Sequence, residues 1–261
     1  MCGIAGCLIG QGADEKRLQT IREIFQENLL ANELRGKEAT GVVACQHNGS
    51  YAYQKAALPA CEFVRQDNFQ DFLTSEITSE TVILLGHTRD PTKGTVANND
   101  NNHPIIVGET VGVHNGVISN DDSIFIRLNH GELSQARIGS VDSEAIFALL
   151  DQVNTNQPLE EYARGLQKAT SHLVGSFTTL FFSKKIPSTL FCLRYDNPIS
   201  THYDQDLNCL FFSSRYVFLR KTFGRAVISK GMPARTGFIF EAQKIKNQGK
   251  TPSLAFALSQ N

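Results

Sequence analysis

The apolar run that opens the chain constrains its fold more than any other feature of the sequence. Residues 2–9 read CGIAGCLI, which has the length and composition of a buried strand. A strand at this position ties the N-terminus into a sheet. The chain has 261 residues, of which 41% are hydrophobic, so it can bury a large core. We find no repeat or linker, and we therefore expect one domain over residues 2–261.

Strand-like and helix-like patterns share the rest of the chain. Asp14 can cap a helix over residues 15–34, and two strand-like runs within residues 40–55 flank a His-Asn-Gly-Ser turn. Apolar spacing predicts helices at 61–73, 145–153 and 159–172, and strands at 81–87, 110–114, 176–183, 188–195 and 207–214. The strands at 81–87 and 110–114 are each expected to end in a histidine. Many connections are too short for parallel crossovers, which favours helices covering a largely antiparallel double sheet.

Charge and cysteine usage exclude several classes of function. The formal net charge is −1 and the charged residues are scattered, so we expect no nucleic-acid partner. No apolar run approaches the roughly 18 residues of a membrane span, and the N-terminus lacks the features of a signal peptide. We therefore expect a cytoplasmic protein with no membrane contact. The six cysteines include no C-x-x-C pair, so we expect neither a metal nor another cofactor.

Cys2 is a candidate nucleophile because it directly follows the initiator methionine. Methionine aminopeptidases remove Met1 when the second residue is small, and cysteine qualifies. The α-amine that is freed has a reference pKa of about 7.7–8.0, so it can act as the base for the thiol of its own residue. The alternative interpretation is a small cysteine buried in a strand.

Four further segments accompany residues 2–6: RGKEATG (35–41), GHTRDPTKG (86–94), HNGVISN (114–120) and SVDSE (140–144). In order and approximate spacing, these segments resemble the class II glutamine amidotransferase domain, an N-terminal-nucleophile hydrolase. This is the glutaminase domain of glutamine:fructose-6-phosphate aminotransferase and of glutamine phosphoribosylpyrophosphate amidotransferase. The resemblance covers residues 2–180 and extends more loosely to about residue 220. It implies an α+β fold, a four-layer α/β/β/α sandwich of two antiparallel sheets, with Cys2 at a strand start inside the cleft.

The resemblance assigns the oxyanion hole to Asn115 and Gly116. Hydrolysis of an amide generates a tetrahedral oxyanion, which needs preorganised hydrogen-bond donors. A side-chain amide and a backbone N–H at these two positions suit that task, and glycine allows close approach. The alternative interpretation is a plain type I′ turn, which an Asn-Gly pair also favours.

Four residues are candidates for binding free L-glutamine. Arg89 suits the α-carboxylate, because a guanidinium binds it with two parallel hydrogen bonds. Asp142 suits the α-ammonium, although it is also well placed to cap the helix that follows it. By resemblance, Thr92 adds a hydroxyl near the carboxylate, and we include His103 among the substrate-binding residues. Buried positioning is the alternative role for the histidines of these motifs, His87, His103 and His114.

The implied reaction is hydrolysis of L-glutamine to L-glutamate and ammonia through a γ-glutamyl thioester on Cys2. We expect no synthase domain in this chain, so a separate synthase would accept the ammonia. Asp90 follows Arg89 where the aminotransferase has a tryptophan that gates ammonia, and Lys93 replaces a histidine. Two alternatives stay open: a self-contained hydrolase of a larger γ-glutamyl amide, and a degenerate glutamine-binding or sensing module.

Overall fold

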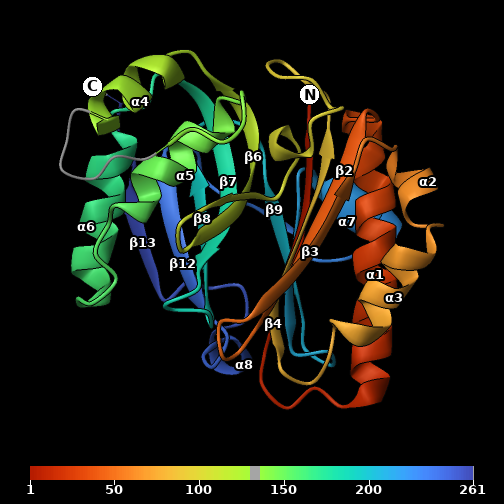
Figure 1. Cartoon of the computed structure of the whole chain (residues 1–261). Helices are drawn as coiled ribbons and strands as arrows, with labels where there is room; N and C mark the ends of the chain where they lie inside the picture. The colour runs from red at the N-terminus through yellow and green to blue at the C-terminus, as the bar shows by residue number, and fades with distance from the viewer. Residues whose placement is uncertain (130–135, 261) are drawn as a thin grey trace.

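Two antiparallel sheets stack face to face between two layers of helices (Figure 1). A computed structural model describes residues 1–129 and 136–260 of the chain. All the strand pairs in this part of the chain are antiparallel. The predicted α+β sandwich is confirmed.

The first sheet holds the N-terminal strand at its centre. Its seven strands run in the order β11-β9-β10-β1-β4-β2-β3. Their bounds are β1 Gly3–Ile9, β2 Ala39–Gln46, β3 Tyr51–Ala56, β4 Thr81–Arg89, β9 Ser200–Asp204, β10 Cys209–Ser213 and β11 Lys230–Gly231. The predicted strand at residues 2–9 and the predicted hairpin at 40–55 are confirmed.

The second sheet has six strands in the order β13-β12-β8-β7-β6-β5. Their bounds are β5 Ile105–Val107, β6 Thr110–Ile118, β7 Gly175–Ser183, β8 Thr189–Arg194, β12 Thr236–Glu241 and β13 Leu254–Ala257. One apolar core fills the space between the sheets, with Ile4 and Leu85 from the first sheet and Val113 and Leu180 from the second.

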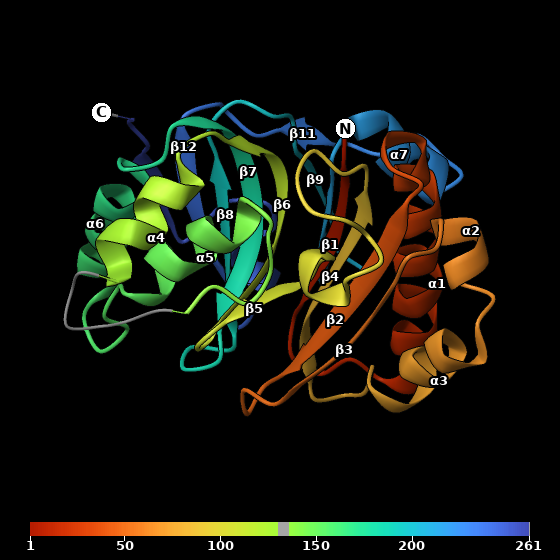
Figure 2. The ribbon, with the colours of Figure 1, turned by 45° about the horizontal axis from the view of Figure 1, so that its top comes forward.

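Helices cover the outer face of each sheet (Figures 1 and 2). Helices α1, α2, α3 and α7 lie on the first sheet, and α4, α5 and α6 lie on the second. Their bounds are α1 Glu15–Asn32, α2 Ala60–Phe63, α3 Asp67–Ser75, α4 Asp121–Asn129, α5 Ser143–Asp151, α6 Leu159–Thr170 and α7 Tyr216–Thr222, with a short α8 at Ile245–Gln248. Within the described ranges, none of these helices is long and apolar enough to cross a membrane.

Two local predictions differ from the structure. The helix expected at 61–73 is split into α2 and α3, because the backbone of Gln66 is extended between them. The strands expected to end at His87 and His114 both continue, β4 to Arg89 and β6 to Ile118. The ladder between β6 and β7 runs through this stretch without interruption, so its Asn-Gly pair lies within a strand and the alternative of a hairpin turn is wrong.

Candidate active site

Strand alternation brings the predicted catalytic residues into the space between the two sheets. Alternate residues of a strand share a face. Ile4 of β1 and Val113 of β6 both lie in the core between the sheets. Asn115 stands two residues after Val113 and so faces this same space, and Cys2 directly precedes β1, at the end of the sandwich where that strand begins.

The thiol of Cys2 lies against the backbone of Asp90. The N–H of Asp90 donates to Sγ at 3.3 Å, and the carbonyl oxygen of the same residue lies 3.4 Å from Sγ. Arg35 Nε donates to the carbonyl oxygen of Cys2 at 2.6 Å, which fixes the backbone there. The N-terminal ammonium of Met1 pairs with the carboxylate of Asp90. The thiol and the carbonyl oxygen of Cys2 are therefore both held by neighbouring polar groups.

The pKa of the Cys2 thiol is raised above its ordinary value, chiefly by burial. The hydrogen bond from the backbone of Asp90, the N-terminal ammonium and the guanidinium of Arg89 act in the opposite direction. The thiol is therefore protonated near neutral pH. Nucleophilic attack requires a base that removes its proton as the reaction begins.

Gly3 allows the first strand to sit close enough to its neighbours to place Cys2. A Cβ at this position would lie 2.5 Å from Thr88 Oγ1 and 2.7 Å from the carbonyl oxygen of Asn32. The Thr88 hydroxyl donates to that same carbonyl at 2.8 Å, so neither partner is free to move away. A side chain here would push the start of β1 outward, and Cys2 with it.

The guanidinium of Arg89 braces the loop that follows β4. Its Nη1 donates to Asn102 Oδ1 at 2.8 Å, and its Nη2 donates to the carbonyl oxygens of Lys93 at 2.6 Å and Gly94 at 2.9 Å. The residue is only 3% exposed. Lys93 extends the brace, because its Nζ lies 2.6 Å from Asp121 Oδ2 in α4. The loop is thus tied to both sheets.

Arg89 lies within electrostatic reach of both Cys2 and Asp142. Burial lowers the pKa of Arg89, and negative charge on Cys2 and on Asp142 raises it. Asp142 occupies the N-cap position of α5, but its side chain does not cap the helix. Asp142 Oδ2 instead accepts the backbone N–H of Ile118 at 2.6 Å, so the expected cap is wrong. The carboxylate is turned toward the end of β6.

Asn115 links the second sheet to the beginning of β1 in the first sheet. Its Nδ2 donates to Ser214 Oγ at 3.0 Å, and this hydroxyl oxygen also accepts the backbone N–H of Ile4 at 2.7 Å. Gly116 follows with a φ of 145°, and a Cβ there would lie 1.9 Å from the carbonyl oxygen of Ser176. Both the conformation and the close approach require glycine at this position.

The three histidines of the motifs are buried and neutral. His87 Nε2 lies 2.9 Å from the carbonyl oxygen of His114, and the rings of His87 and His103 are 4.0 Å apart. Burial is the main cause that lowers the pKa of His87 to about 3 and lowers those of His103 and His114. None of them is suited to act as a general base near pH 7. Substrate contacts for His103 and for Thr92, which is exposed in the loop, remain predictions.

Three residues at this site have roles that the sequence did not reveal. The sequence distinguishes Asp90 only as the replacement of a tryptophan, and Arg35 only as part of a motif. Ser214 follows Leu210 and Phe212 at strand spacing, and both of these face the space between the sheets. That alternation was the available signal for Ser214. The contacts of Asp90 and Arg35 with Cys2 depend on tertiary structure and had no comparable signal.

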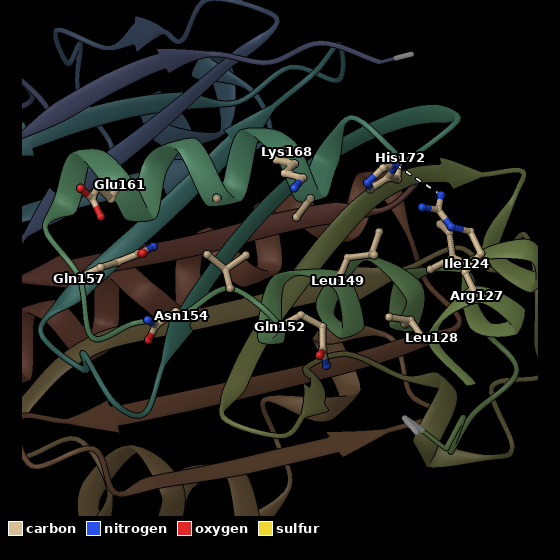
Figure 3. A pocket seen from close by; sticks show the side chains of 13 residues that line it. Ile124, Arg127, Leu128, Leu149, Gln152, Asn154, Gln157, Glu161, Lys168 and His172 are labelled. Atoms are coloured by element: carbon tan, nitrogen blue, oxygen red, sulfur yellow. Dashed lines mark hydrogen bonds between the residues drawn. The ribbon is translucent and has the colours of Figure 1, made fainter. Parts of the chain in front are cut away.

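One groove on the described surface lies away from this cluster. Figure 3 shows this cavity of about 530 Å³ between α4, α5 and α6. Ile124 and Leu149 line it, and Arg127 Nη1 lies 3.4 Å from His172 Nδ1 at one end. None of its lining residues belongs to the cluster around Cys2. Side-chain chemistry, not cavity size, therefore identifies the candidate site.

Sequence comparisons connect the chain with parts of longer enzymes. It is 28% identical over 206 residues to a glutamine–fructose-6-phosphate aminotransferase from Corynebacterium diphtheriae, covering 76% of this chain and 30% of that protein. It is 26% identical over 218 residues to a 7-cyano-7-deazaguanine synthase from Sulfolobus acidocaldarius, covering 82% of this chain and 43% of that protein. The chain thus spans less than half the length of these relatives. No family model matches it.

Solved structures share the fold. The glutamine phosphoribosylpyrophosphate amidotransferase of B. subtilis superposes on 100% of this chain and 50% of its own, with a TM-score of 0.71 and 16% identity. A predicted glutamine amidotransferase from Pseudomonas aeruginosa covers 92% of this chain and 93% of its own, with a TM-score of 0.51 and 14% identity. The resemblance to the class II glutamine amidotransferase domain, predicted from the motifs, is confirmed.

Proposed function

We propose that this chain, which has the sequence motifs and the fold of a class II glutamine amidotransferase domain, hydrolyses L-glutamine with Cys2 as the nucleophile. The observation that carries the proposal is the setting of Cys2. Its thiol lies against the backbone of Asp90, and both Cys2 and Asp142 act electrostatically on the buried Arg89. A nucleophile and two groups of opposite charge thus lie together, as binding of a zwitterionic amino acid requires.

Removal of Met1 would generate the base that the reaction needs. The new α-amine belongs to Cys2 and accepts the proton of the Sγ–H group, which gives a thiolate and an ammonium. The thiolate attacks the side-chain carbonyl carbon of glutamine. The ammonium then gives its proton to the leaving nitrogen, so ammonia departs and a γ-glutamyl thioester remains. Water hydrolyses the thioester to L-glutamate and restores the thiol.

Asn115 and Gly116 are proposed to stabilise the oxyanion of both tetrahedral intermediates. The amide of Asn115 is preorganised by its bond to Ser214, which supports this role because fixed donors need no rearrangement during the reaction. Arg89 is proposed to bind the α-carboxylate, with Thr92 and His103 nearby, and Asp142 the α-ammonium. Nη2 of Arg89 already donates both of its hydrogens to the carbonyl oxygens of Lys93 and Gly94, so two parallel bonds to the carboxylate would require one of these loop bonds to give way.

The ammonia is proposed to pass to a separate synthase. The matched relatives are much longer than the matched region, and their names are those of an aminotransferase and a synthase. This supports an acceptor enzyme as the destination of the ammonia. We further propose that residues 2–261 form one glutaminase domain and that the protein acts in the cytoplasm.

A covalent-labelling experiment tests the function. Intact mass should show loss of Met1, and a glutamine-mimicking diazo-ketone should then add once, at Cys2. Cys2→Ala should abolish both the adduct and glutaminase activity while the protein stays folded, because the change removes one small side chain at the terminus. Cys192→Ala, at a buried cysteine far from β1 in the sequence, is the matched control and should keep both. Near-normal turnover of Cys2→Ala would contradict the proposal.

A further inference from the structure

The carboxylate of Asp90 has no role in the chemistry described above, although it lies beside the nucleophile. It pairs with the N-terminal ammonium, while the backbone of the same residue contacts the thiol of Cys2 at 3.3 and 3.4 Å. One residue therefore meets both the amine and the sulfur at the start of the chain. Figure 2 shows the N-terminus beside the yellow loop that follows β4 and begins with Asp90.

We propose that Asp90 is a positioning residue that binds the α-ammonium of Cys2 once Met1 has been removed, and holds it next to Sγ. The inference rests on the proposed function, because it concerns the amine that acts as base there. The carboxylate would accept a hydrogen bond from the ammonium and limit its rotation about the N–Cα bond. In the neutral amine, an N–H held by the carboxylate would leave the nitrogen lone pair directed at the Sγ–H proton, and the ammonium formed by the transfer would stay bound to Asp90.

The geometry around Cys2 allows the carboxylate of Asp90 to bind the amine of Cys2 in place of the amine of Met1. Successive backbone nitrogens are separated by roughly one residue spacing, about 3–4 Å. The Asp90 side chain is 54% exposed, so it is free to change rotamer and follow the new terminus. Cys2 itself is held in place, because Arg35 Nε binds its carbonyl oxygen at 2.6 Å. The amine therefore comes within reach of a carboxylate that already binds an ammonium.

The negative charge of Asp90 should raise the basicity of the Cys2 amine. Arg89 of β4 acts on Cys2, Arg35 binds the Cys2 backbone, and Arg215, which precedes α7, acts on Arg35. Arg89 and Arg35, which both act on Cys2, disfavour a protonated amine. The carboxylate of Asp90 opposes them and stabilises the ammonium that forms when the thiol loses its proton. Loss of this carboxylate should therefore make the amine a weaker base.

The test compares Asp90→Asn, which removes the charge, with Asp90→Glu, which keeps it. Glu109→Gln is the matched control, because it neutralises a half-exposed carboxylate at the opposite end of β6. Intact mass first establishes that Met1 is absent from every variant. Two readouts follow: the pH profile of kcat/KM for glutamine, and the pH dependence of reductive methylation of the N-terminal amine, measured by mass spectrometry. For the second, the thiol of Cys2 is first blocked as a methyl disulfide, because a free 1,2-aminothiol would close a ring with formaldehyde. The second readout needs no catalysis.

Asp90→Asn should lower the amine pKa by roughly half to one unit, as expected for loss of one partly solvated charge a few ångströms away. The acidic limb of kcat/KM should move to lower pH by the same amount, and kcat on the plateau should fall about tenfold or more through lost orientation. Asp90→Glu and Glu109→Gln should keep the wild-type pKa.

An unchanged methylation profile in Asp90→Asn would overturn the inference, even if turnover fell. A shifted profile in a protein that never hydrolyses glutamine would leave the inference standing and contradict the proposed function. If Asp90→Asn retains Met1, Cys2 can be exposed by cleaving an N-terminal protease site from the same variant. The methylation profile of the cleaved variant then tests the inference in the same way.

Discussion

Replacing Asn115 with alanine distinguishes an enzyme from a binding module, and the structure predicts two separate effects. The first is on stability. Asn115 is 2% exposed and its Nδ2 donates to Ser214 Oγ at 3.0 Å. Losing one partner of a buried hydrogen bond costs about 1–3 kcal/mol. In a domain of this size each kcal/mol lowers Tm by about 2–4 °C, so Tm should fall by roughly 2–12 °C.

The second effect is on turnover. If the amide of Asn115 also stabilises the oxyanion, Asn115→Ala should lower kcat by about 10²–10³ with little change in KM. This pattern is typical of an interaction made chiefly in the transition state. Glutamine binding would survive while hydrolysis nearly stopped. Tm and kcat should be measured on the same preparation, with kcat expressed per folded molecule.

Ser214→Ala supplies the control for the structural part of this effect. It removes the acceptor that Asn115 and the N–H of Ile4 share, but it leaves the Asn115 amide in place. Tm should fall at least as far, because two hydrogen bonds are lost, while kcat should fall less than in Asn115→Ala, because the amide remains but is no longer fixed by Ser214. A lowered Tm with intact kcat in Asn115→Ala would refute the oxyanion role. It would also favour the glutamine-sensing alternative.

Two further predictions concern substrate binding and acid stability. Arg89→Lys and Asp142→Asn should each raise KM for glutamine strongly, because a planar fork and a charge are lost at opposite ends of the substrate. Unchanged glutamine kinetics with weaker hydrolysis of a larger γ-glutamyl amide would instead favour the self-contained hydrolase. Because burial lowers the pKa of His87 from 6.5 to about 3, the unfolded chain binds a proton in this range and the folded protein does not. His87 alone should therefore lower the free energy of unfolding by about 1.4 kcal/mol for each pH unit between roughly pH 6 and pH 3, and His103 and His114, whose pKa values are also lowered, should add to this loss. Urea unfolding at pH 7, 6 and 5 should show that the free energy of unfolding changes less with pH in His87→Asn than in the wild type. An identical change with pH would contradict the lowered pKa of His87.

Local signals in the sequence predicted much of the fold. The carboxylate of Asp14 accepts the N–H of Arg17 at the start of α1, as the capping pattern indicated. The apolar spacing of α5 and α6 and of most central strands was also sufficient. The short strands β9, β11, β12 and β13 were not predicted as elements, because their pairing with neighbours, not their periodicity, defines them.

The sequence motifs proposed residues for the candidate site but not the contacts that these residues make. The motifs named Cys2, Arg89, Asn115 and Asp142, yet the sequence suggested that Asp142 caps a helix. Its side chain accepts a bond from β6 instead, because the second sheet passes close to that end of α5. Whether this carboxylate accepts a backbone N–H of α5 or that of Ile118 depends on tertiary packing, which residue spacing does not predict.

The central position of β1 has a consequence for the order of events during synthesis. β1 pairs with β4 on one side and with β10 on the other, and β10 ends at Ser213. The strand therefore lacks one neighbour until more than 200 residues have been made, which takes roughly 10–40 s at 5–20 residues per second. During that interval the N-terminus remains open to an aminopeptidase at the ribosome. Removal of Met1, which the proposed function requires, can thus precede the pairing of β1 with β10.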